Sequence, residues 1–93
     1  MKSRTSRSFW RRFELLPAEI QRRTRLAFEL WQADPYHPGL SFKCVDDEEA
    51  IYSARIGLHW RVLGVRERGG AEDTIIWYWI GSHAEYDRLI AAN

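Results

Sequence analysis

The chain is short of the features that mark secreted and membrane proteins. It has 93 residues and a single cysteine, Cys44, so no disulfide can form within it, which fits a reducing compartment. No apolar run approaches the roughly 20 residues of a membrane span. The basic N-terminus is not followed by the apolar stretch of a signal peptide. These absences predict a cytoplasmic protein without a membrane segment.

No internal repeat or low-complexity tract interrupts the chain, and 45% of its residues are hydrophobic, including five tryptophans. That composition favours a packed globule over disorder. A chain of this length buries roughly 60–65% of the surface that its unfolded form exposes. Residues 1–93 are therefore expected to form one domain.

The net charge of +1 conceals an uneven distribution. Residues 1–25 hold eight basic and two acidic side chains, whereas residues 26–93 hold six basic and eleven acidic ones. A basic half indicates an anionic partner such as nucleic acid or an acidic protein, although a solvated helix face would look the same. Arg22, Arg23 and Arg25, which lie largely off the apolar stripe of their predicted helix, are the candidates to attract RNA.

The periodicity of the chain changes near residue 39. Before it, a short edge strand over 2–6 and two helices are expected, the first over 9–15 with Ser8 as its cap and the second beginning at Pro17. After it, strands are expected over 40–45, 52–56, 60–66 and 75–80, and a short helix over 83–92. Helices grouped before antiparallel strands indicate an α+β layer architecture, in which the helices pack against an antiparallel sheet.

The turn between the strands at 52–56 and 60–66 decides where two arginines point. A three-residue loop over 57–59 pairs Arg55 with Arg61 on the face opposite the core, whereas a two-residue loop would bury a charge. Two like charges side by side are unfavourable unless an anion or a carboxylate lies between them. The pair is thus either a phosphate-binding site or the partner of an acid in the tail, such as Glu85 or Asp87.

The tail "WIGSHAEYD", residues 79–87, contains a histidine that capping does not explain. Ser82 and Glu85 form a capping-box pattern, which gives both a structural role. His83 falls in the first helical turn, where the helix dipole favours a neutral imidazole able to accept a proton, and Tyr86 shares its face. His83 is therefore a candidate acid or base for a phosphodiester, or else a partly buried polar residue beside a core aromatic.

Together these stretches resemble the RelE/ParE toxin superfamily of bacterial toxin–antitoxin systems. The resemblance runs through "SFWRRFELLPAEIQ", "DPYHPGLSFKCV", "YSARIGLHWRVLGVRE" and "TIIWYWIGSHAEYDRLI". It implies a helical hairpin against a small twisted sheet. It also implies a cognate antitoxin as partner and no metal or small-molecule cofactor.

The RelE-like branch of the superfamily consists of metal-independent mRNA endonucleases that usually act on the ribosome. Their reaction is attack of a ribose 2′-OH on the adjacent phosphate, which needs a base, cations and an acid. The resemblance assigns phosphate and phosphorane stabilisation to Arg55 and Arg61, and proton transfer to His83. It adds Tyr86 for base stacking or proton transfer, and Lys43 as a further cation.

Two other functions stay open at the level of sequence. One is ParE-like inhibition of DNA gyrase, which needs no acid/base group, so the arginines, His83 and Tyr86 favour the nuclease. The other is a degenerate member that only binds an antitoxin. The acidic run at residues 46–49, which follows Lys43 closely in the sequence, keeps that second alternative open.

Overall fold

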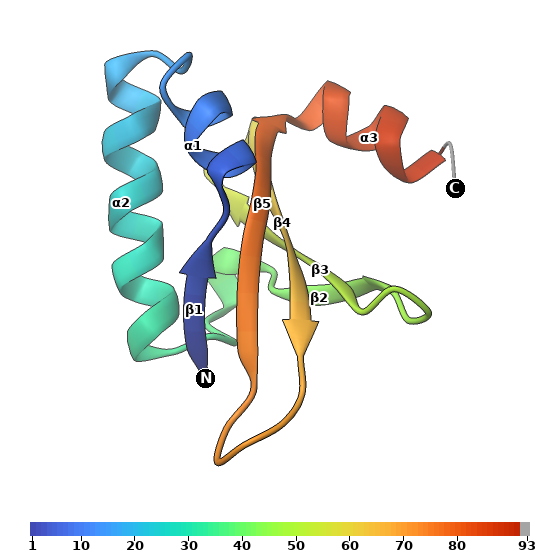
Figure 1. Cartoon of the computed structure of the whole chain (residues 1–93). Helices are drawn as coiled ribbons and strands as arrows, with labels where there is room; N and C mark the ends of the chain where they lie inside the picture. The colour runs from blue at the N-terminus through green and yellow to red at the C-terminus, as the bar shows by residue number, and fades with distance from the viewer. Residues whose placement is uncertain (92–93) are drawn as a thin grey trace.

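The computed structural model describes residues 1–91 and shows two helices packed on one face of a five-stranded sheet (Figure 1). The third helix lies on the other side of the sheet. The elements in chain order are β1 (Lys2–Thr5), α1 (Arg7–Phe13), α2 (Ala18–Ala33), a 3₁₀ turn (Pro38–Leu40), β2 (Lys43–Asp46), β3 (Ile51–Ile56), β4 (Trp60–Glu67), β5 (Thr74–Ser82) and α3 (His83–Ala91). The expected α+β architecture is confirmed.

The sheet has the order β1-β5-β4-β3-β2 and is mixed. Strands β2 to β5 form the expected antiparallel meander. The edge strand β1 instead runs parallel to β5, so the sheet is not wholly antiparallel as the sequence indicated. The reason is the connection, because α1 and α2 carry the chain across the sheet between β1 and the meander.

Two boundaries differ from the expected ones because local hydrogen bonding decides them. Ser6 is the cap of α1, since its Oγ accepts from the Phe9 amide, while Ser8 Oγ donates to the Tyr78 carbonyl instead. The predicted strand over 40–45 begins only at Lys43, because Leu40 belongs to the 3₁₀ turn and packs into the core. Of the predicted C-terminal helix, residue 92 lies outside the described residues.

A β-bulge in β5 lets its apolar run serve both faces of the sheet. Trp77 pairs with Gly64 and Trp79 with Leu63, so Tyr78 is an extra residue that shifts the alternation. Trp77 then points into the core beneath α1 and α2, and Trp79 lies on the opposite face. The strand is covered on both sides, as its composition predicted.

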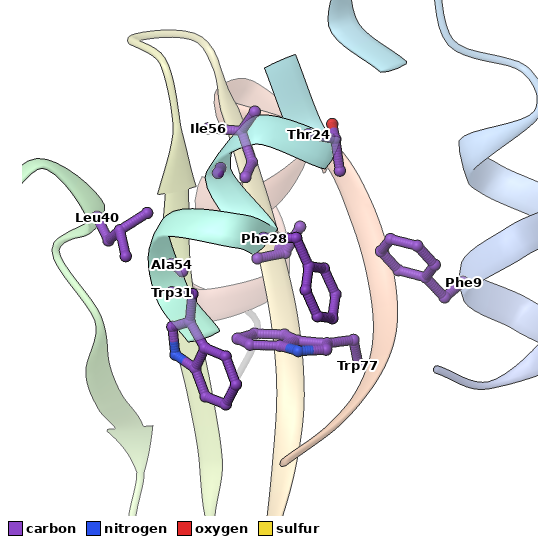
Figure 2. Close-up of a pocket in the computed structure, with 10 residues that line it drawn as sticks. Phe9, Thr24, Phe28, Trp31, Leu40, Ala54, Ile56 and Trp77 are labelled. Carbon is purple, nitrogen blue, oxygen red and sulfur yellow. The ribbon is translucent and has the colours of Figure 1, made fainter. Parts of the chain in front are cut away.

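The core between α2 and the sheet is dominated by aromatic side chains. Trp31, Trp77 and Phe28 meet edge to face, with ring centroids 5.5–6.3 Å apart. Figure 2 shows them around a cavity of only about 20 Å³, walled almost entirely by carbon. That space is about the size of one water molecule, and apolar voids of this kind stay dry. It is a packing defect and too small for a ligand.

Candidate active site

The turn between β3 and β4 has the register that keeps Arg61 out of the core. Arg55 pairs with Arg61 and Ile56 with Trp60 across a three-residue loop, as predicted. Gly57 opens the loop with φ of +64°, a conformation that suits glycine. Ala54 and Val62 face the core, so the two arginines lie side by side on the opposite face.

All five side chains assigned to catalysis from the sequence line one cavity on that face. The cavity holds about 310 Å³. Strands β2, β3 and β4 supply one wall and the first turn of α3 supplies the other. Its lining residues are Ser41, Lys43, Ser53, Ala54, Arg55, Arg61, His83, Tyr86 and Asp87.

The arginine pair has no carboxylate partner among residues 1–91. Arg61 donates to the carbonyls of Trp60 and Leu58, and the Nε of Arg55 is buried without a hydrogen-bond partner. Burial, followed by repulsion from Arg55, lowers the pKa of Arg61 from its ordinary value. The pair is thus a concentrated and incompletely satisfied positive charge, the arrangement that an anion would stabilise.

No tail carboxylate forms a salt bridge with the arginine pair within residues 1–91. Glu85 is occupied by Arg12, at 2.9 Å, and by Ser82. Asp87 lies 3.2 Å from His83 and also lines the cavity, where its attraction partly offsets the lowering of the pKa of Arg61. The tail therefore compensates the charge of the arginines only in part, through Asp87.

Asp87 lies beside the His83 ring, one turn further along α3. Nε2 of His83 lies 3.2 Å from Oδ1 of Asp87, so the carboxylate can help to orient the ring. The His83 side chain is 44% exposed, which leaves it accessible to a ligand.

Tyr86 stands between the histidine and the sheet. Its hydroxyl donates to Ser53 Oγ at 3.3 Å, and its ring centroid lies 6.3 Å from that of His83. The ring is half-buried against β3, yet it still lines the cavity. Sequence reasoning missed Ser53 as a partner, although its place between two core-facing residues of β3 put it on the arginine face.

The predicted capping box is present at the start of α3. The Glu85 amide donates to Ser82 Oγ at 3.1 Å, and the Ser82 amide donates to Glu85 Oε1 at 3.2 Å. These bonds lower the pKa of Glu85, the backbone bond from Ser82 most of all and Arg12 to a smaller extent. The cap holds the turn that carries His83 and Tyr86.

The three arginines of α2 are placed differently from one another. Arg22 and Arg23 both bind Glu19, at 2.7 and 3.1 Å, so that acid offsets part of their charge. Arg25 instead lies over the ring of Phe13, with its guanidinium carbon 4.9 Å from the ring centroid. None of the three lines the cavity described above.

Metal-ligating side chains are scattered in this structure. Within residues 1–91, no three His, Cys, Asp or Glu side chains gather closely enough to hold a metal ion. No helix in that same range is both long and apolar enough to cross a membrane.

The helical pair on a small mixed sheet, with a third helix behind it, has a counterpart among solved structures. The structure matches that of a YoeB/ParE toxin from Agrobacterium tumefaciens with a TM-score of 0.67. The match covers 89% of this chain and 99% of that one at 17% identity. No protein-family profile and no curated protein sequence matches the chain. The resemblance drawn from the sequence is confirmed at the level of the fold.

Proposed function

We propose that this protein is the toxin of a toxin–antitoxin system and cleaves mRNA, and that the phosphodiester binds in the cavity between the sheet and α3. The observation that carries the proposal is the convergence of five side chains, from three strands and one helix, on a cavity whose arginine pair forms no salt bridge within residues 1–91. The shared fold of a YoeB/ParE toxin supports the toxin class.

The roles follow from the chemistry of each group. The ribose 2′-OH gives its proton to the imidazole of His83, and its oxygen forms a bond to phosphorus. The bond from phosphorus to the 5′ oxygen breaks, and that oxygen takes a proton from an acid. The products are a 2′,3′-cyclic phosphate and a 5′-hydroxyl end.

The cations act on the charge that develops at phosphorus. Arg55 and Arg61 present forked donors to the non-bridging oxygens, and the phosphorane carries more charge on those oxygens than the substrate does. Lys43, exposed at the start of β2, adds a third positive charge beside the cavity. Tyr86 offers a ring for base stacking and a hydroxyl for proton transfer.

The direct test is cleavage of RNA by the purified protein, with the chemistry of the ends identified. Cyclic phosphate and 5′-hydroxyl ends, lost in His83→Ala and in Arg61→Ala, are the expected result. Naked RNA and translating ribosomes, tested side by side, decide whether the ribosome is required. Intact RNA in both reactions, at a protein concentration that arrests growth, would overturn the proposal.

Inhibition of DNA gyrase is the second candidate, because the solved structure that shares this fold is described as a YoeB/ParE toxin. A shared fold does not distinguish the two activities, so the test is whether translation or DNA supercoiling fails first in the cell. We expect translation to stop before DNA supercoiling changes when the chain is induced alone. Loss of supercoiling first would favour the gyrase function.

The proposed partner is an antitoxin that covers the arginine pair. Its carboxylates would complete the neutralisation of the pair, which Asp87 provides only in part. An obligate interface of this kind buries on the order of 2,000 Å² or more. A complex in which Arg55 and Arg61 both stay exposed to solvent would contradict this masking.

The arginines of α2 are proposed to attract RNA without reading its sequence. Replacement of Arg22, Arg23 and Arg25 by Gln should weaken binding equally for all RNAs and flatten its salt dependence. Because Glu19 offsets the first two, Arg25→Gln alone should account for a large share of the change. A changed cleavage preference with an unchanged salt slope would show that these residues read sequence.

A further inference from the structure

One arginine outside the cavity connects the two sides of the sheet. Arg12, in the last turn of α1, donates from Nε to the Ile80 carbonyl at 2.7 Å and from a terminal nitrogen to Glu85 Oε2 at 2.9 Å. Its guanidinium carbon also lies 5.0 Å from the centroid of the Trp79 ring. A single side chain therefore contacts the strand and the helix that follows it.

Arg12 can reach both because the edge of β5 is open at this point. Strand β1 ends where Thr5 pairs with Trp77, so the rest of β5 has no neighbouring strand on that side. Figure 1 shows α1 beside this upper part of β5. Side chains of α1 satisfy the exposed carbonyls, Ser8 that of Tyr78 and Arg12 that of Ile80.

The path of the side chain around the edge depends on Gly81. A Cβ at this position would lie 2.4 Å from the Trp79 ring and 3.1 Å from a terminal nitrogen of Arg12. The absence of a side chain lets Trp79 lie flat over the strand, with the guanidinium stacked on it. The packing of Arg12 against Trp79 and Gly81, and not charge alone, directs its guanidinium group toward Glu85.

Glu85 transmits this anchor to the start of α3. One carboxylate oxygen binds Arg12 while the other accepts from the Ser82 amide and hydroxyl. None of the nine residues of α3 is fully buried, so apolar packing holds the helix only weakly. Its direction therefore rests on a few polar contacts, and the first turn carries His83.

We propose that Arg12 is a positioning residue for RNA cleavage, which through Glu85 fixes the first turn of α3 and thereby the placement of His83 and Tyr86 over the arginine pair. The inference rests on the proposed function, since it gives Arg12 a task in that reaction. Arg12 is not among the residues that line the cavity, so it acts through Glu85.

The kinetic test compares Arg12→Gln with Arg11→Gln, its exposed neighbour in the same turn of α1. Both remove one positive charge, so both change the attraction of RNA alike. Because a displacement of about 1 Å can cost on the order of 100-fold in rate, Arg12→Gln should lower kcat by about 10- to 100-fold and leave KM close to that of Arg11→Gln. Equal kinetics for the two variants would overturn the inference.

Two further variants show whether Arg12 acts through the histidine. In the His83→Ala background, Arg12→Gln should cause little additional loss, because the group that it positions is gone. Arg12→Lys keeps the charge but cannot donate to the Ile80 carbonyl and to Glu85 at the same time, so its kcat should lie between those of Arg12→Gln and wild type. Full additivity with His83→Ala would show that Arg12 acts independently of it.

An NMR measurement separates failure of this inference from failure of the proposed function. Arg12→Gln should shift the imidazole signals of His83 and speed amide exchange in the first turn of α3, whereas Arg11→Gln should change neither. If wild type cleaves no RNA while these changes occur, the nuclease function is refuted and the anchoring stands. Unchanged His83 signals and unchanged amide exchange in α3 would refute the anchoring. If Arg12→Gln does not fold, Arg12→Lys takes its place in both the kinetic and the NMR test.

Discussion

Replacement of Arg61 by Gln should make the protein more stable and less active. Arg55 and Arg61 are direct cross-strand partners, and neither has a carboxylate partner within residues 1–91. Two unit charges about 6 Å apart repel by about 0.7 kcal/mol in water and by about 3 kcal/mol at an effective dielectric constant of 20. Removal of one charge relieves this repulsion and the desolvation that lowers the pKa of Arg61.

The substitution also loses hydrogen bonds and the attraction of Asp87, and both losses oppose the gain. Arg61 donates to the Trp60 carbonyl at 2.9 Å and to the Leu58 carbonyl at 3.5 Å, and a Gln side chain can keep one such bond. A net hydrogen bond is worth about 0.5–1.5 kcal/mol. The expected balance is a rise of roughly 0.5–1.5 kcal/mol in the free energy of unfolding.

Urea denaturation and thermal unfolding at low ionic strength measure this difference. A gain of about 1 kcal/mol corresponds to roughly 4–8 °C in Tm for a domain of this size. In 1 M salt the Debye length falls to about 3 Å, so most of the gain should vanish there. Phosphate should stabilise wild type more than the variant, because it binds the folded site.

Arg61→Lys is the matched control, because it keeps the charge and should keep the low stability. RNA cleavage should fall sharply in Arg61→Gln despite the firmer fold. A Gln variant that is less stable than wild type, at low and at high salt alike, would mean that the guanidinium supports the turn. The reasoning about an unsatisfied pair would then be refuted.

Three further predictions concern the tail and α2. His83→Ala should reduce cleavage by about 10²–10⁴-fold at matched folded protein, whereas Ser82→Ala should cost about 0.5–2 kcal/mol of stability in urea denaturation and little chemistry; equal loss of cleavage in both would make the histidine structural. Gly81→Ala should destabilise by about 1–3 kcal/mol in the same assay, since its Cβ would meet the Trp79 ring at 2.4 Å, and an unchanged midpoint would contradict that packing. Hydrogen bonds from Arg22 and Arg23 lower the pKa of Glu19 to about 2 from 4.5, so its contribution to stability is present above pH 4.5 and is lost as the pH falls toward 2; in urea denaturation Glu19→Gln should therefore unfold more easily than wild type at pH 7 but like wild type near pH 2.

The strand register and the candidate site were predictable because burial allowed only one answer. A shift by one residue at the β3–β4 turn would have placed Arg61 in the core, and such a charge is too costly there. The capping box at Ser82 likewise needed only local spacing. The register fixed the shared face of Arg55 and Arg61, whereas the place of His83 beside them depends on how α3 packs and was expected only from the family resemblance.

The features that were not predictable depend on contacts between distant parts of the chain. Arg12 and Glu85 are 73 residues apart, and only the open edge of β5 brings them together. The bulge at Tyr78 leaves no mark in an apolar run, since both faces of the strand are covered. The parallel direction of β1 follows from how α1 and α2 cross the sheet, which periodicity does not encode.

The arrangement separates stability from chemistry by placing them on opposite faces of the sheet. The aromatic core of Trp31 and Trp77 lies beneath α1 and α2, whereas Arg55, Arg61 and His83 lie on the other face, where α3 packs loosely. Substitutions in the cavity can therefore alter catalysis without opening the core. Arg12 is the exception, because it belongs to α1 on the core side and holds Glu85 on the other. Replacement of Arg12 should consequently move the first turn of α3, which carries His83, while the core remains intact.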